Sequence, residues 1–277
     1  MNVTTIFNEI FGLGGISFLA FLLIKLWVAH KQLKEQMREA AQHPNSTDIH
    51  SLRIGSMSPN FTADSTQGKI NFHEWIGDSW CLLVSHPKDF TPVCTTELGK
   101  LVEKQNEFAK LNCKIITLSD DSCSSHIKWG KDIREIYSNG IKFPMIDDSN
   151  LWVAKLYNML PQFEPASKTR SPLQNATVRS IFLIAPDKTI RMKLTYPLLV
   201  GRNYDEVLRC LKAIQLCDTY PVGTPEGWSP GVQVLSAPGL AKVSKELPVN
   251  SNLIKVKDYF VLVKDPSAPK RNYDSNH

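Results

Sequence analysis

The sequence predicts an α/β fold with a mixed sheet flanked by helices, preceded by a single transmembrane helix and followed by a smaller C-terminal region. Between residues 51 and 217, short apolar runs typical of buried strands alternate with segments of helical spacing. Pro186-Asp187-Lys188 is a turn signal between two strands. A largely apolar run occupies residues 10–29, and proline and glycine become frequent after residue 217.

The strands and helices of the main region follow from the spacing of its apolar residues. Residues 81–85 form a short apolar run, as expected of a central strand covered on both faces. Residues 95–112 place Leu98, Leu101 and Phe108 on one side of a helix. The remaining predictions, in order, are a strand at 114–118, a helix at 124–137, a short strand at 143–146, a helix at 150–159, strands at 178–185 and 189–194, and a helix at 204–216. After residue 217 only 259–263 is typical of a strand, so we expect domains at 1–50, 51–217 and 218–277.

Residues 10–29 are long enough to cross a bilayer as one helix, and Trp27 suits the membrane interface. The residues before this run carry Glu9 and no Lys or Arg, which argues against the alternative of a cleaved signal peptide. A buried helix of a soluble domain is a weaker alternative, because the run has no polar face. Basic residues follow it, so the positive-inside rule predicts a single-pass anchor with its C-terminal side in the cytoplasm: Lys31, Lys34 and Arg38. The outer mitochondrial membrane and the endoplasmic reticulum both fit.

Composition argues against several classes of function. The chain has 277 residues, of which 42% are hydrophobic, and this is enough for a full core. The net charge of +5 comes from scattered basic residues without interleaved aromatic residues, so we expect no nucleic-acid partner. The six cysteines include no C-x-x-C pair and no Cys/His cluster with zinc spacing. We therefore expect no metal, no disulfide framework and a reducing compartment.

One cysteine lies where a strand ends and a helix begins. Pro92 suits the first helical position, and Thr91 then occupies the N-cap. Cys94 falls in the first turn, among unpaired N–H groups and at the positive end of the helix dipole, which stabilises a thiolate. The alternative is a buried cysteine that packs as a small hydrophobic residue.

The segment around this cysteine resembles the active-site segment of the peroxiredoxins, and is closest to their one-cysteine, peroxiredoxin-6-like branch. Residues 85–99 read SHPKDFTPVCTTELG. Two further matches to the same branch are FPMIDD at 143–148 and YP at 196–197 followed by GRNYDE at 201–206. The resemblance runs from about residue 54 to 259 and does not cover the apolar N-terminal run.

The resemblance implies a thioredoxin-like fold and a peroxidase that reduces hydrogen peroxide and organic or lipid hydroperoxides. Cys94 matches the peroxidatic cysteine, which attacks the O–O bond and becomes a sulfenic acid. Thr91 matches the threonine that holds the peroxide, and Pro87 matches the proline that shields the pocket. Arg179 matches the arginine that stabilises the thiolate and the transition state. His86 adjoins the pocket, and an auxiliary role and a structural role are equally open.

The resemblance also bears on the reductant. Two-cysteine relatives carry a resolving cysteine in a Val-Cys-Pro motif, whereas the comparable residues 220–228 here read YPVGTPEGW. This favours a one-cysteine mechanism with no bound cofactor and an external thiol reductant, such as glutathione, or its carrier protein. A homodimer is implied by the family. The other cysteines are interpreted as structural thiols: Cys81, Cys113, Cys123, Cys210 and Cys217.

Two alternative functions stay open. Some relatives hydrolyse phospholipids with a Gly-x-Ser-x-Gly motif, a histidine and an aspartate, and the matching residues here are Ser79, His73 and Asp187. The last glycine of the motif is Cys81, and Ser79 precedes a strand, unlike a nucleophile elbow, so Ser79 and Asp187 also fit as turn residues. The second alternative is a non-catalytic redox sensor that passes oxidation of its cysteine to a partner.

Overall fold

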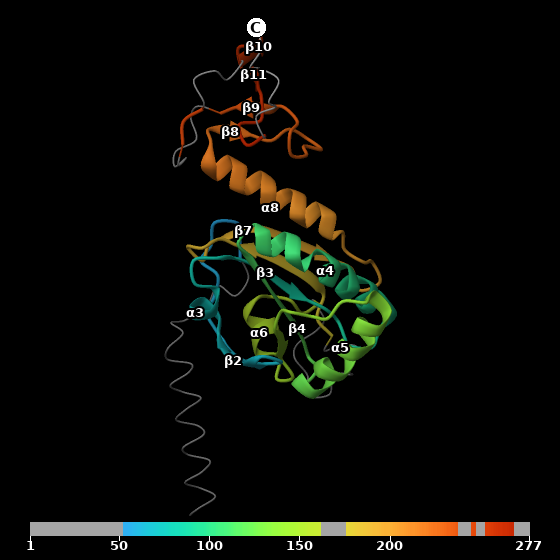
Figure 1. Ribbon diagram of the computed structural model, residues 1–277. Coiled ribbons are helices and arrows are strands. Elements are labelled where there is room, and N and C mark those ends of the chain that lie inside the picture. Colours follow the sequence, from blue (N-terminus) through green and yellow to red (C-terminus); the bar gives the residue numbers. More distant parts are fainter. Residues whose placement is uncertain (1–51, 162–175, 238–244, 248–252, 269–277) are drawn as a thin grey trace, which may run out of the picture. The chain divides into compact units, whose positions relative to one another are not determined.

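The computed structural model describes residues 52–161, 176–237, 245–247 and 253–268. The described residues form one compact unit, built on a seven-stranded mixed sheet with flanking helices (Figure 1). The strand order is β2-β1-β5-β4-β3-β6-β7. The strands are β1 Thr62–Ser65, β2 Gly68–Asn71, β3 Trp80–Ser85, β4 Cys113–Ser119, β5 Met145–Asp147, β6 Arg179–Ile184 and β7 Ile190–Tyr196.

Strand β3 lies inside the sheet, where it pairs parallel with β4 and antiparallel with β6. A further parallel pair joins β4 to β5, and β6 and β7 form an antiparallel hairpin around the turn at residues 186–188. The predicted mixed α/β sheet is therefore confirmed. The antiparallel pairing brings the start of β6 beside the end of β3, where the cysteine-bearing segment begins.

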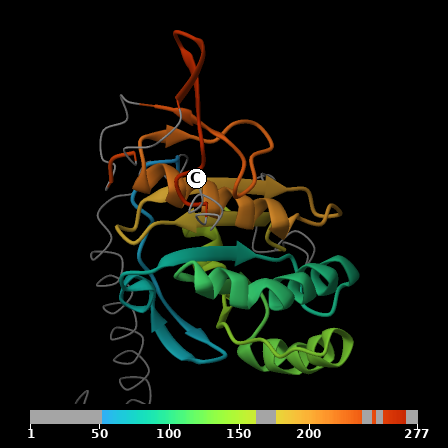
Figure 2. The same cartoon turned by 45° about the horizontal axis from the view of Figure 1, so that its top comes forward.

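Helices cover both faces of the sheet, which explains the apolar run of β3. Leu82 and Val84 point into a core shared with α4 Pro92–Lys110, α5 Cys123–Tyr137 and α8 Tyr204–Thr219. Cys81 and Leu83 point the other way, into a core shared with α3 Phe72–Ile76 and α6 Trp152–Leu156. Because both faces are covered, all six residues of β3 are buried. Figure 2 shows α4 and α5 side by side on their face.

Three elements near the start of the described chain have too weak a sequence signal to be predicted. The hairpin of β1 and β2 reads TADS and GKIN, which contain few of the β-branched and aromatic residues that favour strands. Its turn depends on Gly68, whose φ of 96° is accessible to few other residues. Helix α3 is short, and is capped by the side chain of Asn71, which accepts a hydrogen bond from the N–H of Glu74.

The C-terminal region contains more strands than the one predicted at 259–263. Its sheet has the order β10-β11-β9-β8, with β8 Val222–Gly223, β9 Val234–Ser236, β10 Leu253–Lys257 and β11 Phe260–Val263. A small core joins this sheet to α8 through Leu216, Val222, Trp228, Val234 and Val263. Helix α8 continues to Thr219, past the predicted boundary at residue 217.

The prediction of a membrane anchor requires correction. Within the ranges that the structure describes, no helix combines the length and the apolar character needed to cross a bilayer. The prediction of a single-pass membrane protein, and of the orientation derived from it, is therefore withdrawn. The apolar run at residues 10–29 lies outside the described residues.

Close packing of α4 against α5 gives a test of the fold. A Cβ atom added to Gly99 of α4 would lie 2.0 Å from the Tyr137 ring, so Gly99→Ala must displace that ring. We expect Gly99→Ala to lower the free energy of unfolding by about 1–3 kcal/mol, measured by urea denaturation.

The matched control is Gly130→Ala in α5, where the nearest atom to the added Cβ is the Ile141 Cδ1 at 3.5 Å. Alanine has the higher helix propensity, so this variant gains up to about 1 kcal/mol. Equal effects of the two substitutions would contradict the packing described here.

Candidate active site

Cys94 lies in the first turn of α4 and is 1% exposed. The Arg179 Nη1 donates a hydrogen bond to its Sγ over 3.4 Å. Arg179 is the first residue of β6, which the antiparallel pairing places beside the segment that follows β3. The sheet thus brings together two residues that are far apart in the sequence, as the resemblance implied for this pair.

The guanidinium of Arg179 is held by two further acceptors. Its Nη1 also donates to the Glu97 Oε2 at 2.8 Å, and its Nε donates to the Leu198 carbonyl at 2.7 Å. Glu97 follows Cys94 by one turn of α4, so both side chains project from the same side of the helix. Arg179 and Glu97 are both buried, which fixes the direction of the N–H groups that face the sulfur.

A second arginine completes this network. The backbone N–H, Nε and Nη2 of Arg202 all donate to the carboxylate of Glu97, at 2.6–2.9 Å. Its Nη1 donates to the carbonyls of Ser85 and Ser180, which lie at the paired ends of β3 and β6. Burial raises the pKa of Glu97, but the hydrogen bonds and charge of Arg202, with the charge of Arg179, outweigh it and lower the pKa overall.

A pocket of about 340 Å³ opens beside Arg179. Its walls are mostly apolar and comprise Pro87, Lys88, Thr91, Pro92, Val93, Ala176, Arg179, Leu198 and Leu199. Three of the four residues assigned from the resemblance line this pocket. The fourth, Cys94, accepts a hydrogen bond from Arg179.

Thr91 occupies the predicted N-cap position, but its hydroxyl caps nothing. The Thr91 Oγ1 donates instead to the Lys88 carbonyl at 2.9 Å, within the loop that precedes α4. Pro92 is the first helical residue, as predicted. With its proton engaged in the loop, the hydroxyl oxygen keeps lone pairs that can accept a hydrogen bond from a ligand in the pocket.

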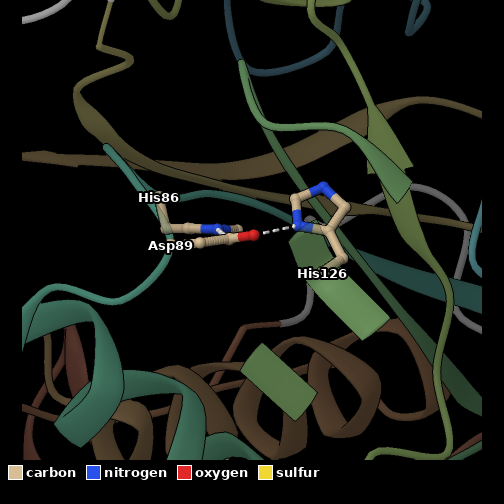
Figure 3. A group of neighbouring side chains, drawn as sticks. All are labelled: His86, Asp89 and His126. Carbon is tan, nitrogen blue, oxygen red and sulfur yellow. Dashed lines mark hydrogen bonds and ion pairs between the residues drawn. The ribbon is translucent and has the colours of Figure 1, made fainter. Parts of the chain in front are cut away.

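His86 takes part in a separate buried cluster with Asp89 and His126. Figure 3 shows His86, Asp89 and His126 together. His86 Nε2 lies 2.9 Å from the Asp89 Oδ1, and its ring lies 5.2 Å from that of Trp129. Burial lowers the pKa of His86, although Asp89 raises it in part. Among the described contacts His86 has none with the Cys94 sulfur, so the geometry gives no support to an auxiliary role at the thiol.

Each of the three residues in this cluster has one nitrogen or oxygen atom that could bind a metal ion, and these atoms lie within 4.8 Å of one another, a spacing that also occurs in cation sites. Here hydrogen bonds of 2.8–2.9 Å account for their arrangement. Burial raises the pKa of Asp89, but hydrogen bonds with His126 and His86 outweigh it, so the pKa falls well below its ordinary value.

The three residues considered for lipid hydrolysis are engaged with other partners. His73 Nε2 lies 2.8 Å from the Ser58 carbonyl, and the Ser79 hydroxyl donates to the Asn112 Oδ1 at 2.9 Å. Asp187 Oδ1 accepts hydrogen bonds from the N–H and hydroxyl of Thr189, as a turn residue does. The described hydrogen bonds join no two of His73, Ser79 and Asp187.

All six cysteines lie in the described residues, and none forms a disulfide. Burial raises the pKa of Cys81 and of Cys113. Burial also raises the pKa of Cys210, to about 11, with a contribution from Glu206. These thiols therefore resist ionisation, which fits the structural role predicted for them.

Sequence reasoning assigned no role to Glu97, Arg202 or His126. Glu97 lies one helical turn from Cys94, and this spacing was the available signal. His126 shares the buried face of α5 with Trp129 and Ile133, at helical spacing. A histidine on an otherwise apolar face needs buried partners, but the sequence does not indicate where they come from.

The Glu97 network gives a prediction on stability and pH. Glu97→Gln leaves two buried guanidinium groups short of their carboxylate, so we expect the free energy of unfolding to fall by about 3–5 kcal/mol at pH 7. The pKa of Glu97 is lowered from its ordinary value of 4.5, so its contribution is full above pH 4.5 and is lost as the pH falls through the folded value. Urea denaturation between pH 3 and 7 should show a flatter acid decline for the variant.

Glu103→Gln on the exposed side of the same helix is the control, because Glu103 pairs only with Lys100 at the surface among the described ion pairs. It should leave stability within about 0.5 kcal/mol of the original. An acid decline in Glu97→Gln as steep as that of the unmodified protein would refute the assignment.

Comparison with known proteins agrees with this geometry. Residues 54–193 match the AhpC/TSA family. The chain is 43% identical over 216 residues to the 1-Cys peroxiredoxin of Dictyostelium discoideum, covering 78% of this chain and 86% of the relative. It is 44% identical over 195 residues to peroxiredoxin-6 of Mus musculus, covering 69% and 85%.

A solved structure of the yeast mitochondrial 1-Cys peroxiredoxin superimposes with a TM-score of 0.67 at 42% identity, covering 77% of this chain and 100% of that chain. The sheet with its flanking helices is thus the thioredoxin-like fold that the resemblance implied. The relatives named 1-Cys peroxiredoxin and peroxiredoxin-6 match most of this chain. The chain therefore belongs to the AhpC/TSA family, in its one-cysteine peroxiredoxin branch, and is a thiol peroxidase.

Proposed function

We propose that Cys94 is the peroxidatic cysteine and that Thr91, Pro87 and Arg179 form its reaction site. The observation that carries the proposal is the hydrogen bond from the Arg179 Nη1 to the Cys94 Sγ. The position of Cys94 in the first turn of α4 adds unpaired N–H groups and the positive end of the helix dipole. Both features favour a thiolate, which is the nucleophile.

The reaction then follows from the charges. The Cys94 thiolate attacks the outer oxygen of a peroxide, forming an S–O bond while the O–O bond breaks. The cysteine is oxidised to a sulfenic acid, and the leaving oxygen takes up a proton to become water or an alcohol. Negative charge moves from sulfur onto oxygen, so fixed N–H donors around the reacting atoms lower the barrier.

Arg179 supplies such a donor in a fixed direction. Its guanidinium is always charged, and its hydrogen bonds to Glu97 and to the Leu198 carbonyl fix its orientation. Thr91 contributes a hydroxyl oxygen that can accept a hydrogen bond from the O–H of the peroxide, and Pro87 covers one wall of the pocket without exposing an N–H group. Glu97 and Arg202 act as positioning residues for Arg179 and not on the peroxide itself.

The apolar lining of the pocket supports organic hydroperoxides as substrates beside hydrogen peroxide. Leu198 and Leu199 contribute exposed apolar surface at its rim, with 37% and 83% of each residue accessible. Burying the hydrocarbon part of a hydroperoxide against this surface adds binding free energy that hydrogen peroxide cannot provide. We propose alkyl and lipid hydroperoxides as the class of substrate that benefits.

An external thiol completes the cycle in this proposal. The other five cysteines are interpreted as structural, so the sulfenic acid at Cys94 is reduced from outside the chain. The thiol of the yeast relative is resolved through glutathione and thioredoxin systems, which supports one of these as the reductant here. The homodimer implied by the resemblance stays a prediction.

The first test concerns the chemistry. Stopped-flow oxidation of the full chain by hydrogen peroxide should be lost in Cys94→Ser. Arg179→Lys keeps the charge but loses the planar donor fork, so the rate constant should fall by roughly 10²–10³.

The matched control is Arg191→Lys on β7, where the guanidinium pairs with Asp218 near the surface. We expect its rate constant to stay within about twofold of the original, because a partly exposed ion pair contributes little. A Cys94→Ser protein that consumes peroxide at the original rate would disprove the assignment.

The second test concerns the substrate. Leu199→Asp places a charge at the apolar rim, so the ratio of the rate constant for cumene hydroperoxide to that for hydrogen peroxide should fall roughly tenfold. Leu253→Asp on β10 makes the same change at a residue that is 59% exposed and outside the pocket, and it should leave the ratio unchanged. If both variants keep the ratio, the pocket does not select substrates.

A further inference from the structure

Both ring nitrogens of His126 face acceptors. Nδ1 lies 2.8 Å from the Asp89 Oδ2, and Nε2 lies 3.0 Å from the Ile146 carbonyl oxygen (Figure 3 shows the first of these contacts). A carbonyl oxygen can only accept, so Nε2 must carry a hydrogen. A neutral imidazole has only one N–H, and it would therefore leave Nδ1 as an acceptor facing the carboxylate.

The other contacts of Asp89 bear on whether His126 is a neutral imidazole or an imidazolium with two N–H groups. The hydroxyl of Ser125 donates to the Asp89 Oδ2 at 2.8 Å, and His86 Nε2 lies 2.9 Å from Oδ1. The second nitrogen of His86, Nδ1, has no partner among the described residues. A carboxylate that accepts from three side chains satisfies all these contacts when both nitrogens of His126 carry N–H groups. Hydrogen bonds with His126 and His86 outweigh burial and lower the pKa of Asp89 well below its ordinary value, which favours this arrangement over a protonated Asp89 beside a neutral imidazole.

Asp89 belongs to the segment at residues 87–94 that carries Pro87, Thr91 and Cys94. The Asp89 N–H also donates to the Asp121 Oδ2 at 2.8 Å, so both its backbone and its side chain are tied to the region where β4 leads into α5. The next residue, Phe90, has a φ of 55°, which is a strained conformation for an aromatic residue. Such strain persists only where the surroundings hold the chain in place.

We propose that His126 is a positioning residue for peroxide reduction: as a doubly protonated, buried imidazolium it clamps Asp89 to α5, and so holds the strained segment that presents Thr91 and Cys94. The inference rests on the proposed function of Cys94 and adds a residue from another helix to it. Among its described contacts, His126 touches no reacting atom, and its hydrogen bond to the segment is made through Asp89.

The charged groups around His126 agree with this assignment. Asp89 and His86 face it from the segment after β3, Asp121 from the loop after β4, and Asp147 from β5. Burial lowers the pKa of His126, but the hydrogen bond and charge of Asp89, with the Ile146 carbonyl and Asp121, raise it overall. A raised folded pKa means that the clamp is complete below the ordinary value of 6.5 and is lost as the pH rises through the folded value.

Nitrogen NMR on the unmodified full chain, labelled with ¹⁵N histidine, tests the protonation directly. At pH 7 we expect the Nδ1 and Nε2 of His126 both to carry protons, with His86 neutral. A non-protonated nitrogen on His126 at pH 7 would overturn the proposal. This measurement is decisive even if a variant fails to fold.

Two substitutions test the positioning. His126→Leu removes both donors, and we expect the rate constant for oxidation of Cys94 by hydrogen peroxide to fall roughly 10- to 100-fold, with faster amide hydrogen exchange in residues 87–94. His126→Asn keeps an N–H near the Asp89 carboxylate and should recover most of the rate. A merely structural histidine predicts lower stability in both variants, with no change in the rate of the folded protein.

The control is Asp148→Asn, which alters another carboxylate that is 1% exposed and accepts the N–H groups of Val153 and Ala154 in α6. It should lower stability and leave the rate constant unchanged. An unchanged rate in folded His126→Leu overturns the positioning role. Cys94→Ser that retains peroxide consumption instead defeats the assignment of Cys94, whatever the state of His126.

Discussion

The carboxylate of Glu97, buried between two arginines, is the interaction on which the site depends. It receives hydrogen bonds from Arg179 and Arg202, and these arginines reach the loop carbonyl of Leu198 and the ends of β3 and β6. One side chain on α4 thus links the helix that carries Cys94 to the strand that carries Arg179. Each partner is individually costly to bury, and the network is stable only with all its members present.

A second buried cluster holds the loop that precedes α4. Asp89 joins the loop before α4 to α5 through Ser125 and His126, whereas Glu97 joins the body of α4 to the sheet. The segment at residues 87–94 is therefore held by Asp89 through its contacts with α5 and by Cys94 through Arg179. This explains how a short loop with a strained Phe90 keeps a defined conformation beside an open pocket.

Much of the fold is encoded in local sequence patterns, and the predicted elements agree with the structure wherever such a pattern exists. The run at β3 and the periodicities of α4, α5 and α8 gave elements close to those observed, because each buries its own apolar residues. The β1–β2 hairpin and the short strands β8 and β9 depend on pairing partners and have little signal of their own. The membrane helix was inferred from the length of an apolar run and the residues that flank it, and no described helix supports it.

The candidate site likewise contains residues that a local sequence pattern predicts and residues that only the tertiary fold brings together. The position of Cys94 at a helix start follows from Thr91 and Pro92, but Arg179, Arg202 and His126 are brought in by the sheet and by helix packing, which no local pattern encodes. Arg179 was found through the resemblance only.

The shared carboxylate has a consequence for the resting and the oxidised states of the protein. Two guanidinium groups meet a single carboxylate, which leaves one positive charge for the Cys94 sulfur to balance. A thiolate supplies that balance, whereas a neutral sulfenic acid does not. In the reaction proposed for Cys94, oxidation therefore leaves a buried positive charge without its counter-charge, which lowers the stability of the fold until an outside thiol restores the thiolate. Reduction of the sulfur and stability of the fold are, under that proposal, linked equilibria.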